Sequence, residues 1–379
     1  MPAKEQIPHD KTVRNDKFLE FLNNLLVQSA LCCAMPPAMG SGDALTEFRS
    51  IRSEDLPEVS RFLIRIYRVE RTAPFADPRF LAWKYLTPRS EWNGSRGYVV
   101  EYQRKIVAHA GVSPGVLRLP GGSEVSCITI MDWAADPSVR GVGVSLFKEL
   151  MKLAETVYII GGTPATRHIL PKIGFERAGE ACTFSRWIRP VREFRTRPLS
   201  GRSVLRLLHG ISRFRKTQPG NRRMNSRSVP SFDESLQLLL NQRSSDFAYR
   251  QRTVENLNYL LACPARGVKG HLLLEQDTVC GYFIMATVDW ETRLLDIFVN
   301  SADVLDWQLA YSAAAAAAEA DPSSCRIRTL ATTPMHREAL VGAGYWEQYK
   351  EPIMIHDPNN RLTTSQPVNF QLCDEDGGY

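Results

Sequence analysis

The chain has 379 residues, of which 44% are hydrophobic and 23% are charged, and its formal net charge is +6. These proportions are those of a folded globular protein, and they exclude a disordered or fibrous chain. The length exceeds what one hydrophobic core usually supports, so we expect two domains of ordinary size.

The N-terminal region contains a fairly apolar stretch over residues 18–34, but Glu20, Asn23 and Asn24 interrupt it. An N-terminal extension over residues 1–45 is therefore favoured over a signal peptide. No run approaches the roughly eighteen apolar residues of a membrane span, so none is expected. The eight cysteines lack the paired spacing of a zinc site and lie in apolar stretches. These features predict a reduced, cytoplasmic protein without a bound metal.

Residues 46–190 alternate between strand-like and helix-like patterns. One helical stripe is clear from its apolar spacing at Leu56, Val59, Phe62 and Leu63. The order of the elements predicts a mixed sheet of the α/β class. The expected strands are 46–52, 97–101, 106–112, 125–133, 157–160 and 183–188, and the expected helices are 54–67, 77–86, 141–155 and 164–173.

A basic segment separates this region from the next. Between Arg186 and Pro230 there are thirteen Arg or Lys residues and one acid, a net +12, so the rest of the chain is about −6 (6 − 12). We interpret residues 191–229 as a linker, with one possible basic helix over residues 202–216. Such a segment can bind nucleic acid, but sparse aromatic residues favour a solvated connector.

The second region, residues 230–357, repeats patterns of the first and is followed by a tail over residues 358–379. The segment Thr163–Phe175 aligns without gaps on Thr333–Tyr345 at an offset of 170, with five of thirteen positions identical. Upstream, Leu81–Pro88 matches Leu257–Pro264 in its Leu, aromatic and Pro positions. Two short matches in the same order indicate a tandem duplication. The sequence thus predicts two related α/β lobes joined by a basic linker.

The most informative local pattern runs from Asp136 to Leu150. An apolar strand leads into a turn that contains Gly141 and Gly143, and an amphipathic helix follows directly. Glycine allows close approach of a ligand, and the first amides of a helix are free to donate to a phosphate. Taken alone, this pattern is also compatible with tight packing.

The strand, the turn, the helix and the later Lys172–Phe175 segment together resemble the GCN5-related N-acyltransferase family, and the segment Phe80–Tyr85 fits its tandem bacterial members. The resemblance covers residues 46–190 and implies acetyl- or acyl-coenzyme A as cosubstrate. It implies that the backbone of Trp133, Ala134 and Ala135 pairs with pantetheine. It further implies a pyrophosphate site at the amides of Arg140, Gly141, Val142, Gly143, Val144 and Ser145.

The sequence departs from the family pattern in three places. The turn fits the pattern Arg/Gln-x-x-Gly-x-Gly/Ala imperfectly in two registers, one with Arg140, Gly143 and Ser145 and the other with Ser138, Gly141 and Gly143. Thr163, counted among the candidate coenzyme contacts, stands where the family often has Asn. Leu170 replaces the Tyr that often protonates the departing thiolate, so the resemblance supports coenzyme binding better than the usual acid.

Two residues are candidates for the base that deprotonates an acceptor amine. Asp132 lies at the end of the strand beside the expected thioester, where a desolvated carboxylate could accept a proton. His109 lies in the middle of a strand and is the second candidate. Both residues are also compatible with purely structural roles.

The second lobe has neither glycine nor a basic residue at the corresponding strand-to-helix corner, so no second coenzyme site is expected. The leading hypothesis is transfer of an acyl group, with acetyl favoured, from coenzyme A to a primary amine of a small molecule, sugar or peptide. One alternative is an aminoacyl or peptidyl transferase of related tandem fold that uses a charged RNA. Another is a non-catalytic binding protein in which both lobes have decayed.

Overall fold

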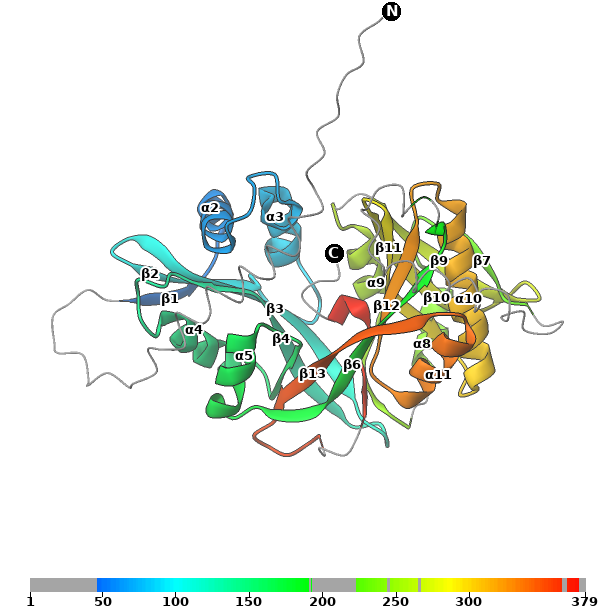
Figure 1. Cartoon of the computed structure of the whole chain (residues 1–379). Coiled ribbons are helices and arrows are strands. Elements are labelled where there is room, and N and C mark those ends of the chain that lie inside the picture. The colour runs from blue at the N-terminus through cyan, green and yellow to red at the C-terminus, as the bar shows by residue number, and fades with distance from the viewer. Residues whose placement is uncertain are drawn as a thin grey trace, which may run out of the picture.

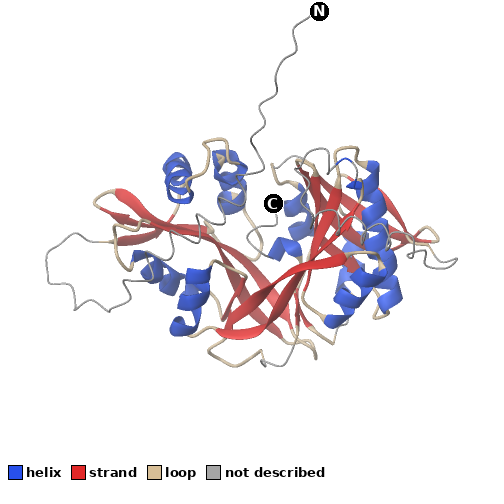
Figure 2. Cartoon of the chain, viewed as in Figure 1, coloured by secondary structure: helices blue, strands red, loops and turns tan. Residues whose placement is uncertain are grey.

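The computed structural model describes residues 46–190, 192, 223–243, 246–264, 267–362 and 367–374. They form two lobes around one mixed sheet that runs through both (Figure 1). In the first lobe, helices α2 and α3 lie on one side of the sheet and α4 and α5 on the other (Figure 2). The predicted α/β class and two-lobed arrangement are confirmed.

The first lobe follows the predicted order of elements. Four of the five buried residues of α2 are those of the predicted stripe, and the fifth is Ser60. Helix α3 starts where the Asp77 carboxylate accepts a hydrogen bond from the Arg79 amide at 2.8 Å. The elements are β1 (Glu47–Ser50), η1 (Ser53–Asp55), α2 (Leu56–Tyr67), η2 (Pro74–Ala76), α3 (Pro78–Leu86), β2 (Gly97–Tyr102), β3 (Lys105–Arg118), β4 (Glu124–Ala135), α4 (Val142–Leu150), η3 (Met151–Leu153), β5 (Thr156–Ile160), α5 (Pro164–Ile169), η4 (Leu170–Ile173) and β6 (Glu176–Trp187).

Apart from the short extra strand β8, the strands and helices of the second lobe follow the order of the first, and the tandem duplication stays a prediction. The second lobe begins earlier than residue 230, because residues 225–229 form a strand that pairs with β9. The elements are β7 (Asn225–Val229), α8 (Glu234–Asn241), β8 (Ala248–Arg250), α9 (Val254–Leu261), β9 (Val268–Glu275), β10 (Thr278–Val288), β11 (Glu291–Val299), α10 (Val304–Ala320), β12 (Arg326–Ala331), α11 (Pro334–Gly342) and β13 (Trp346–His356).

The lobes exchange their last strands. The order across the sheet is β1-β2-β3-β4-β5-β13-β6-β12-β11-β10-β9-β7. Strand β13, from the second lobe, lies between β5 and β6 of the first, while β6 pairs with β12 of the second. This pairing explains why β6 begins at Glu176 and not at 183: its first half bonds to a strand that is distant in sequence. The exchange makes the two lobes one structure.

Residues 367–374, in the predicted tail, pack between the lobes. They contain β14 (Val368–Asn369) and η5 (Leu372–Asp374), and β14 pairs with β8. Phe370 is fully buried and stacks on Tyr158 of β5 at 4.3 Å between ring centroids. The segment is therefore part of the core shared by both lobes.

Several predicted features fall outside the described residues. These are the N-terminal extension 1–45, nearly all of the basic linker and its possible helix over residues 202–216. Within the part of the chain that is described, no helix is both long and apolar enough to cross a bilayer.

Candidate functional site

Strands β4 and β5 separate part of the way along their length. Their parallel pairing is limited to three residues of each strand, Cys127–Thr129 of β4 and Thr156–Tyr158 of β5. Beyond this point β4 continues beside β3, whereas Ile159 and Ile160 of β5 pair with β13. The stretch of β4 from Ile130 to Ala135 therefore has an edge that no strand of the described residues pairs with, where an extended ligand arm can be bound by main-chain groups.

The turn after β4 uses its two glycines differently. Gly141 has a φ of +76°, in the left-handed region that glycine tolerates, and a Cβ there would meet nothing within 4 Å. A Cβ on Gly143 would lie 2.9 Å from the Cβ of Ala135, so α4 approaches β4 closely at this residue. The Trp133 indole fixes the contact by donating to the Gly143 carbonyl at 3.0 Å. These requirements favour the register with Ser138, Gly141 and Gly143.

The start of α4 offers a row of unpaired amides. For the amides of residues 140–144 the described part of the chain provides no acceptor. The Ser145 amide, which was also predicted to contribute, instead donates to the Gly141 carbonyl at 3.0 Å and closes the first helical turn. The remaining donors, together with the helix dipole, form a cradle suited to a pyrophosphate.

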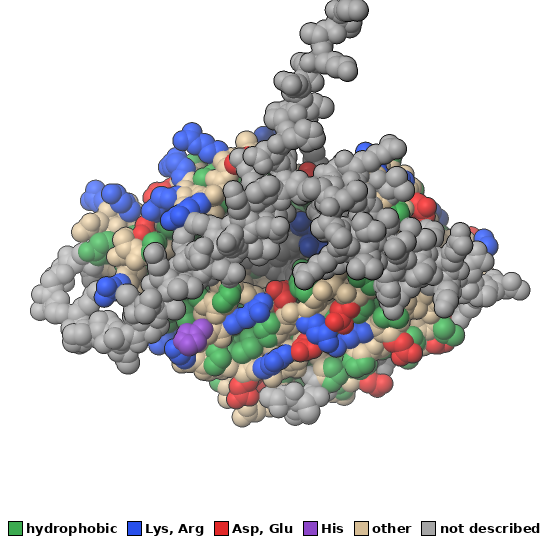
Figure 3. All heavy atoms as spheres, in the orientation of Figure 1, with side chains coloured by type: hydrophobic (Ala, Val, Ile, Leu, Met, Phe, Trp, Pro, Cys, Tyr) green, Lys and Arg blue, Asp and Glu red, His purple; other side chains and the backbone are tan. Residues whose placement is uncertain are grey.

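A cationic surface adjoins this cradle. An open hollow of about 620 Å³ between α2 and the glycine turn is lined by the cations Arg61, Arg65 and Lys105 and by the acids Glu58 and Asp136, of which Asp136 pairs with Arg65. Lys and Arg side chains also gather at this end of the molecule in Figure 3, over the region of α2, whereas elsewhere on that face they alternate with acids. The surface beside the turn therefore carries a small excess of positive charge.

The three residues predicted to hold pantetheine differ in what they present. The Asp136 amide donates to the Val107 carbonyl at 2.7 Å. The residues Ala135 and Ala108, which face each other across β4 and β3, are therefore a non-hydrogen-bonded pair. Ala135 thus points its amide and carbonyl away from β3, while Ala134, one residue earlier in the alternation, points its groups toward β3. The Trp133 carbonyl already accepts a hydrogen bond from the Tyr67 hydroxyl at 3.1 Å. Ala135 is the best placed of the three.

A β-bulge turns Asp132 into the protein. Two residues of β4, Asp132 and Trp133, lie opposite Ala110 alone, and Asp132 has a φ of +50°. Its carboxylate meets Lys84 Nζ at 2.7 Å, and the Tyr85 hydroxyl donates to the same oxygen. Burial opposes its ionisation, but Lys84 and Tyr85 outweigh burial and hold the pKa of Asp132 below its usual value.

His109 lies in the same buried cluster. Its Nδ1 is 3.3 Å from the Asp132 carbonyl, and its ring packs edge-on against Tyr85. Among the described residues its Nε2 has no hydrogen-bond partner. Burial lowers the pKa of His109 to about 4, so the imidazole is neutral at pH 7. The structure thus brings both candidate bases together, in a cluster that is closed to bulk solvent.

Other side chains that the sequence singled out serve the fold. The Thr163 hydroxyl caps α5 by accepting from the Thr166 amide at 3.2 Å. Leu170, at the position of the missing Tyr, is fully buried in the core of the first lobe. In the second lobe, the start of α10 is capped by Asp303, which accepts from the Leu305 amide at 2.9 Å. This acidic cap agrees with the absence of an anion cradle expected there.

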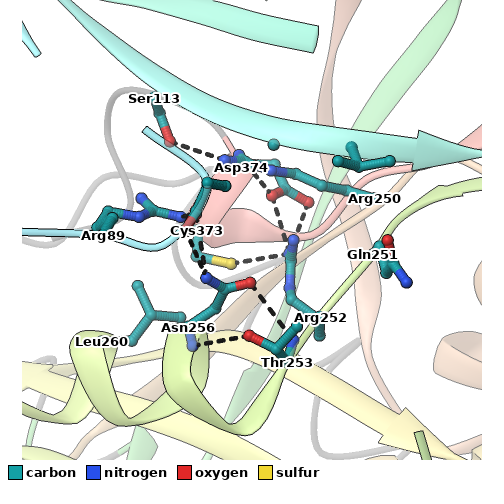
Figure 4. A pocket seen from close by; sticks show the side chains of 13 residues that line it. Arg89, Ser113, Arg250, Gln251, Arg252, Thr253, Asn256, Leu260, Cys373 and Asp374 are labelled. Carbon is teal, nitrogen blue, oxygen red and sulfur yellow. Dashed lines mark hydrogen bonds and ion pairs between the residues drawn. The ribbon is translucent and has the colours of Figure 1, made fainter. Parts of the chain in front are cut away.

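A cavity lies between the lobes on the far side of the bulge from α4. It consists of two adjoining hollows, of about 60 and 40 Å³, which share Arg89, Ser113, Leu260 and Cys373. We call it the interlobe cavity. Lys84 and Met131 line one end, next to Asp132. Arg250 and Arg252 line the other end, which Figure 4 shows. The cavity therefore leads from the second lobe to the point where β4 leaves β5.

No protein-family model and no curated protein matches the sequence. Solved structures do match. A GCN5-related N-acetyltransferase from Anabaena variabilis has a TM-score of 0.55 and 13% identity, with 82% of this chain and 72% of that chain covered. The Saccharomyces cerevisiae N-myristoyltransferase, solved with myristoyl-CoA, has a TM-score of 0.58 and 12% identity, with 93% and 98% covered.

The chain has the GCN5-related N-acyltransferase fold. A third match, from Kribbella flavida, has a TM-score of 0.51 and 14% identity over 82% of this chain and 71% of that chain. At these identities the likeness concerns the fold. It places the unpaired edge of β4 and the α4 cradle in a fold whose solved examples include acyltransferases.

Sequence reasoning missed most of the buried polar residues around this site. Lys84 and Tyr85 belong to the quoted Phe80–Tyr85 segment, but nothing in that segment shows that they face Asp132. Arg250 and Arg252 lie in a stretch that has no recognisable motif. A signal for this pair is their alternation in a short strand-like segment, which places two cations on one face.

Proposed function

We propose that the first lobe transfers an acyl group from coenzyme A to a primary amine. The observation that carries the proposal is the combination of an unpaired β4 edge and, next to it, a cradle at α4 whose amides have no acceptor among the described residues. In this arrangement the pyrophosphate binds residues 140–144 and the pantetheine arm follows β4 from Ala135. The thioester then lies near the bulge at Asp132. Acetyl is the acyl group we propose.

The cluster around Asp132 determines how protons are handled. Asp132 is anionic and His109 neutral at pH 7, so Asp132 is the group able to accept a proton. Because Lys84 and Tyr85 lower its pKa, it is a weak base, and the acceptor amine has to arrive neutral. The amine then attacks the thioester carbonyl and the thiolate leaves. With Leu170 in place of a Tyr, the thiolate takes its proton from water.

A calorimetric titration with coenzyme A tests the proposal. We expect one molecule bound per chain. The variant Gly141→Glu places a carboxylate in the pyrophosphate cradle and should weaken binding about 100-fold or more, because juxtaposed like charges cost several kcal/mol. Gly141→Ala introduces only the backbone strain of the left-handed conformation, about 1–2 kcal/mol, and serves as the uncharged control.

A second control adds the same charge to the other lobe. Ala302 is exposed at the strand-to-helix corner before α10, so Ala302→Glu should leave coenzyme A binding unchanged. Binding of two molecules per chain, or equal affinity in all variants, would place the coenzyme elsewhere. Release of free thiol from acetyl-coenzyme A across a panel of amines then separates an acyltransferase from a non-catalytic binding protein.

A further inference from the structure

The interlobe cavity is rich in cations. Its lining includes the five cations Lys84, Arg89, Arg96, Arg250 and Arg252, but only the two carboxylates of Glu91 and Asp374. Most of the cations have a carboxylate partner. Arg250 and Arg252 bind Asp374, at 3.0 and 2.8 Å, and Lys84 binds Asp132.

Arg96 is the exception. It is 1% exposed, and its guanidinium donates only to the carbonyls of residues 83, 84 and 87 and to the Tyr259 hydroxyl. The described residues provide no carboxylate within ion-pair distance. Burial lowers the pKa of Arg96. A buried guanidinium held only by neutral oxygens retains an uncompensated charge that an anion would neutralise.

Arg89 supplies an unused hydrogen-bond donor at the same place. Its side chain is 10% exposed and is bound to Glu91, yet its Nε is buried without a hydrogen-bond partner among the described residues. The Arg89 guanidinium lies 4.8 Å from the centroid of the Tyr259 ring, over whose face the Arg96 guanidinium also lies. Figure 4 shows the Arg89 side chain extending into the cavity toward Cys373. Both arginines therefore line the hollow that ends at Lys84 and Met131.

We infer that the acceptor amine carries an anionic group, a carboxylate or a phosphate, which binds Arg89 and Arg96 in the interlobe cavity. The inference rests on the proposed function and adds the chemical class of the acceptor. The cavity has room for a small head group, since a water molecule needs roughly 10–15 Å³ of such space. A ligand bound there by its anion extends past Met131 toward the bulge, which places its amine near the thioester.

The test uses chain saturated with coenzyme A, so that the α4 cradle is filled and a second anion has to bind elsewhere. Inorganic phosphate and acetate are titrated by calorimetry, followed by two matched pairs: glycine against glycinamide, and glucosamine 6-phosphate against glucosamine. We expect at least one anion to bind, and the anionic member of its pair to bind about 10- to 100-fold more tightly, the usual effect of a charge-assisted hydrogen bond. The acetate and phosphate arms show which anion is recognised.

Variants locate the effect. Arg89→Gln should remove most of the preference, and Arg96→Lys should retain part of it because the charge remains. Arg177, an exposed residue of β6 whose side chain is 61% exposed, provides the control Arg177→Gln, which should change nothing. Coenzyme A affinity and the thermal unfolding midpoint of each variant verify that it is folded.

Three outcomes overturn the inference: no anion binds the loaded chain, the neutral partners bind equally well, or Arg89→Gln keeps the full preference. In each case coenzyme A binding is intact and the proposed acyl transfer stands. Failure of coenzyme A itself to bind would instead remove the proposed function.

Discussion

The ion pair between Lys84 and Asp132 provides a quantitative test of the site. Both side chains are 9% exposed and their charged atoms are 2.7 Å apart. At an effective dielectric constant of 20 this distance corresponds to an attraction of about 6 kcal/mol, and the desolvation of two ions offsets much of it. Removal of one partner leaves the other charge buried and unpaired. We therefore expect Asp132→Asn to cost about 3–5 kcal/mol of unfolding free energy.

Asn is the suitable replacement because it tolerates the left-handed backbone at residue 132 nearly as well as Asp. Lys84→Met should cost a similar amount, and the double variant should cost about 2–3 kcal/mol less than the sum, since neither charge then remains unpaired. Urea denaturation of the four proteins, with coenzyme A absent, measures this coupling.

The pH dependence has a definite sign. The pKa of Asp132 is lower in the folded protein than in the unfolded chain, where it is about 4. The contribution of Asp132 to the unfolding free energy is therefore fully present above the unfolded-state pKa, and it is lost as the pH falls through the folded-state pKa. The difference between wild type and Asp132→Asn should be constant from about pH 5 to 8 and shrink in acid. A cost below about 1 kcal/mol, or an additive double variant, would refute the buried ion pair.

Other predictions concern catalysis and the C-terminal segment. The pKa of His109 is about 4 and that of Asp132 is lowered, so neither group titrates between about pH 6 and 9. Turnover should therefore rise with pH along a single limb that is set by the ionisation of the acceptor amine. A bell-shaped profile would reveal an additional general acid. Asp132→Asn should lower kcat about 100-fold with coenzyme A affinity retained, and full activity would shift attention to His109, tested with His109→Gln. Phe370→Ala should lower the unfolding free energy by about 3–5 kcal/mol, measured by denaturation, because a fully buried ring is removed.

Local periodicity was sufficient to predict many elements of the first lobe. The stripe of α2 and the strand-turn-helix around Gly141 were predictable because each is specified by residues within one or two turns of chain. The same holds for the internal repeat, which pointed to a second lobe of the same order. The role of Gly143 was ambiguous in sequence, since close packing and ligand approach both demand glycine; its neighbour Ala135 resolves the ambiguity.

The remaining features depend on long-range pairing. The ion-pair partner of Asp132 is Lys84, which lies 48 residues earlier, and no sequence spacing rule connects the two residues. The first half of β6 carries no clear alternation, because its place in the sheet is fixed by β13. In the sequence, Arg96 looks like an ordinary arginine in a turn, because its buried environment is formed by α3 and α9. Such residues are recognised only when the fold has placed their partners.

The strand exchange also determines when the first lobe can be completed during synthesis of the chain. The ribosome finishes β6 at Trp187, but β13, which separates β5 from β6, ends at His356, 169 residues later (356 − 187). At about 5–20 residues per second, this interval lasts roughly 8 to 34 s. During that time the exposed edge of β5 lacks its neighbour, although the glycine turn and α4 have already been synthesised. The half of the protein that is made first therefore reaches its final form only after nearly all of the second has been translated.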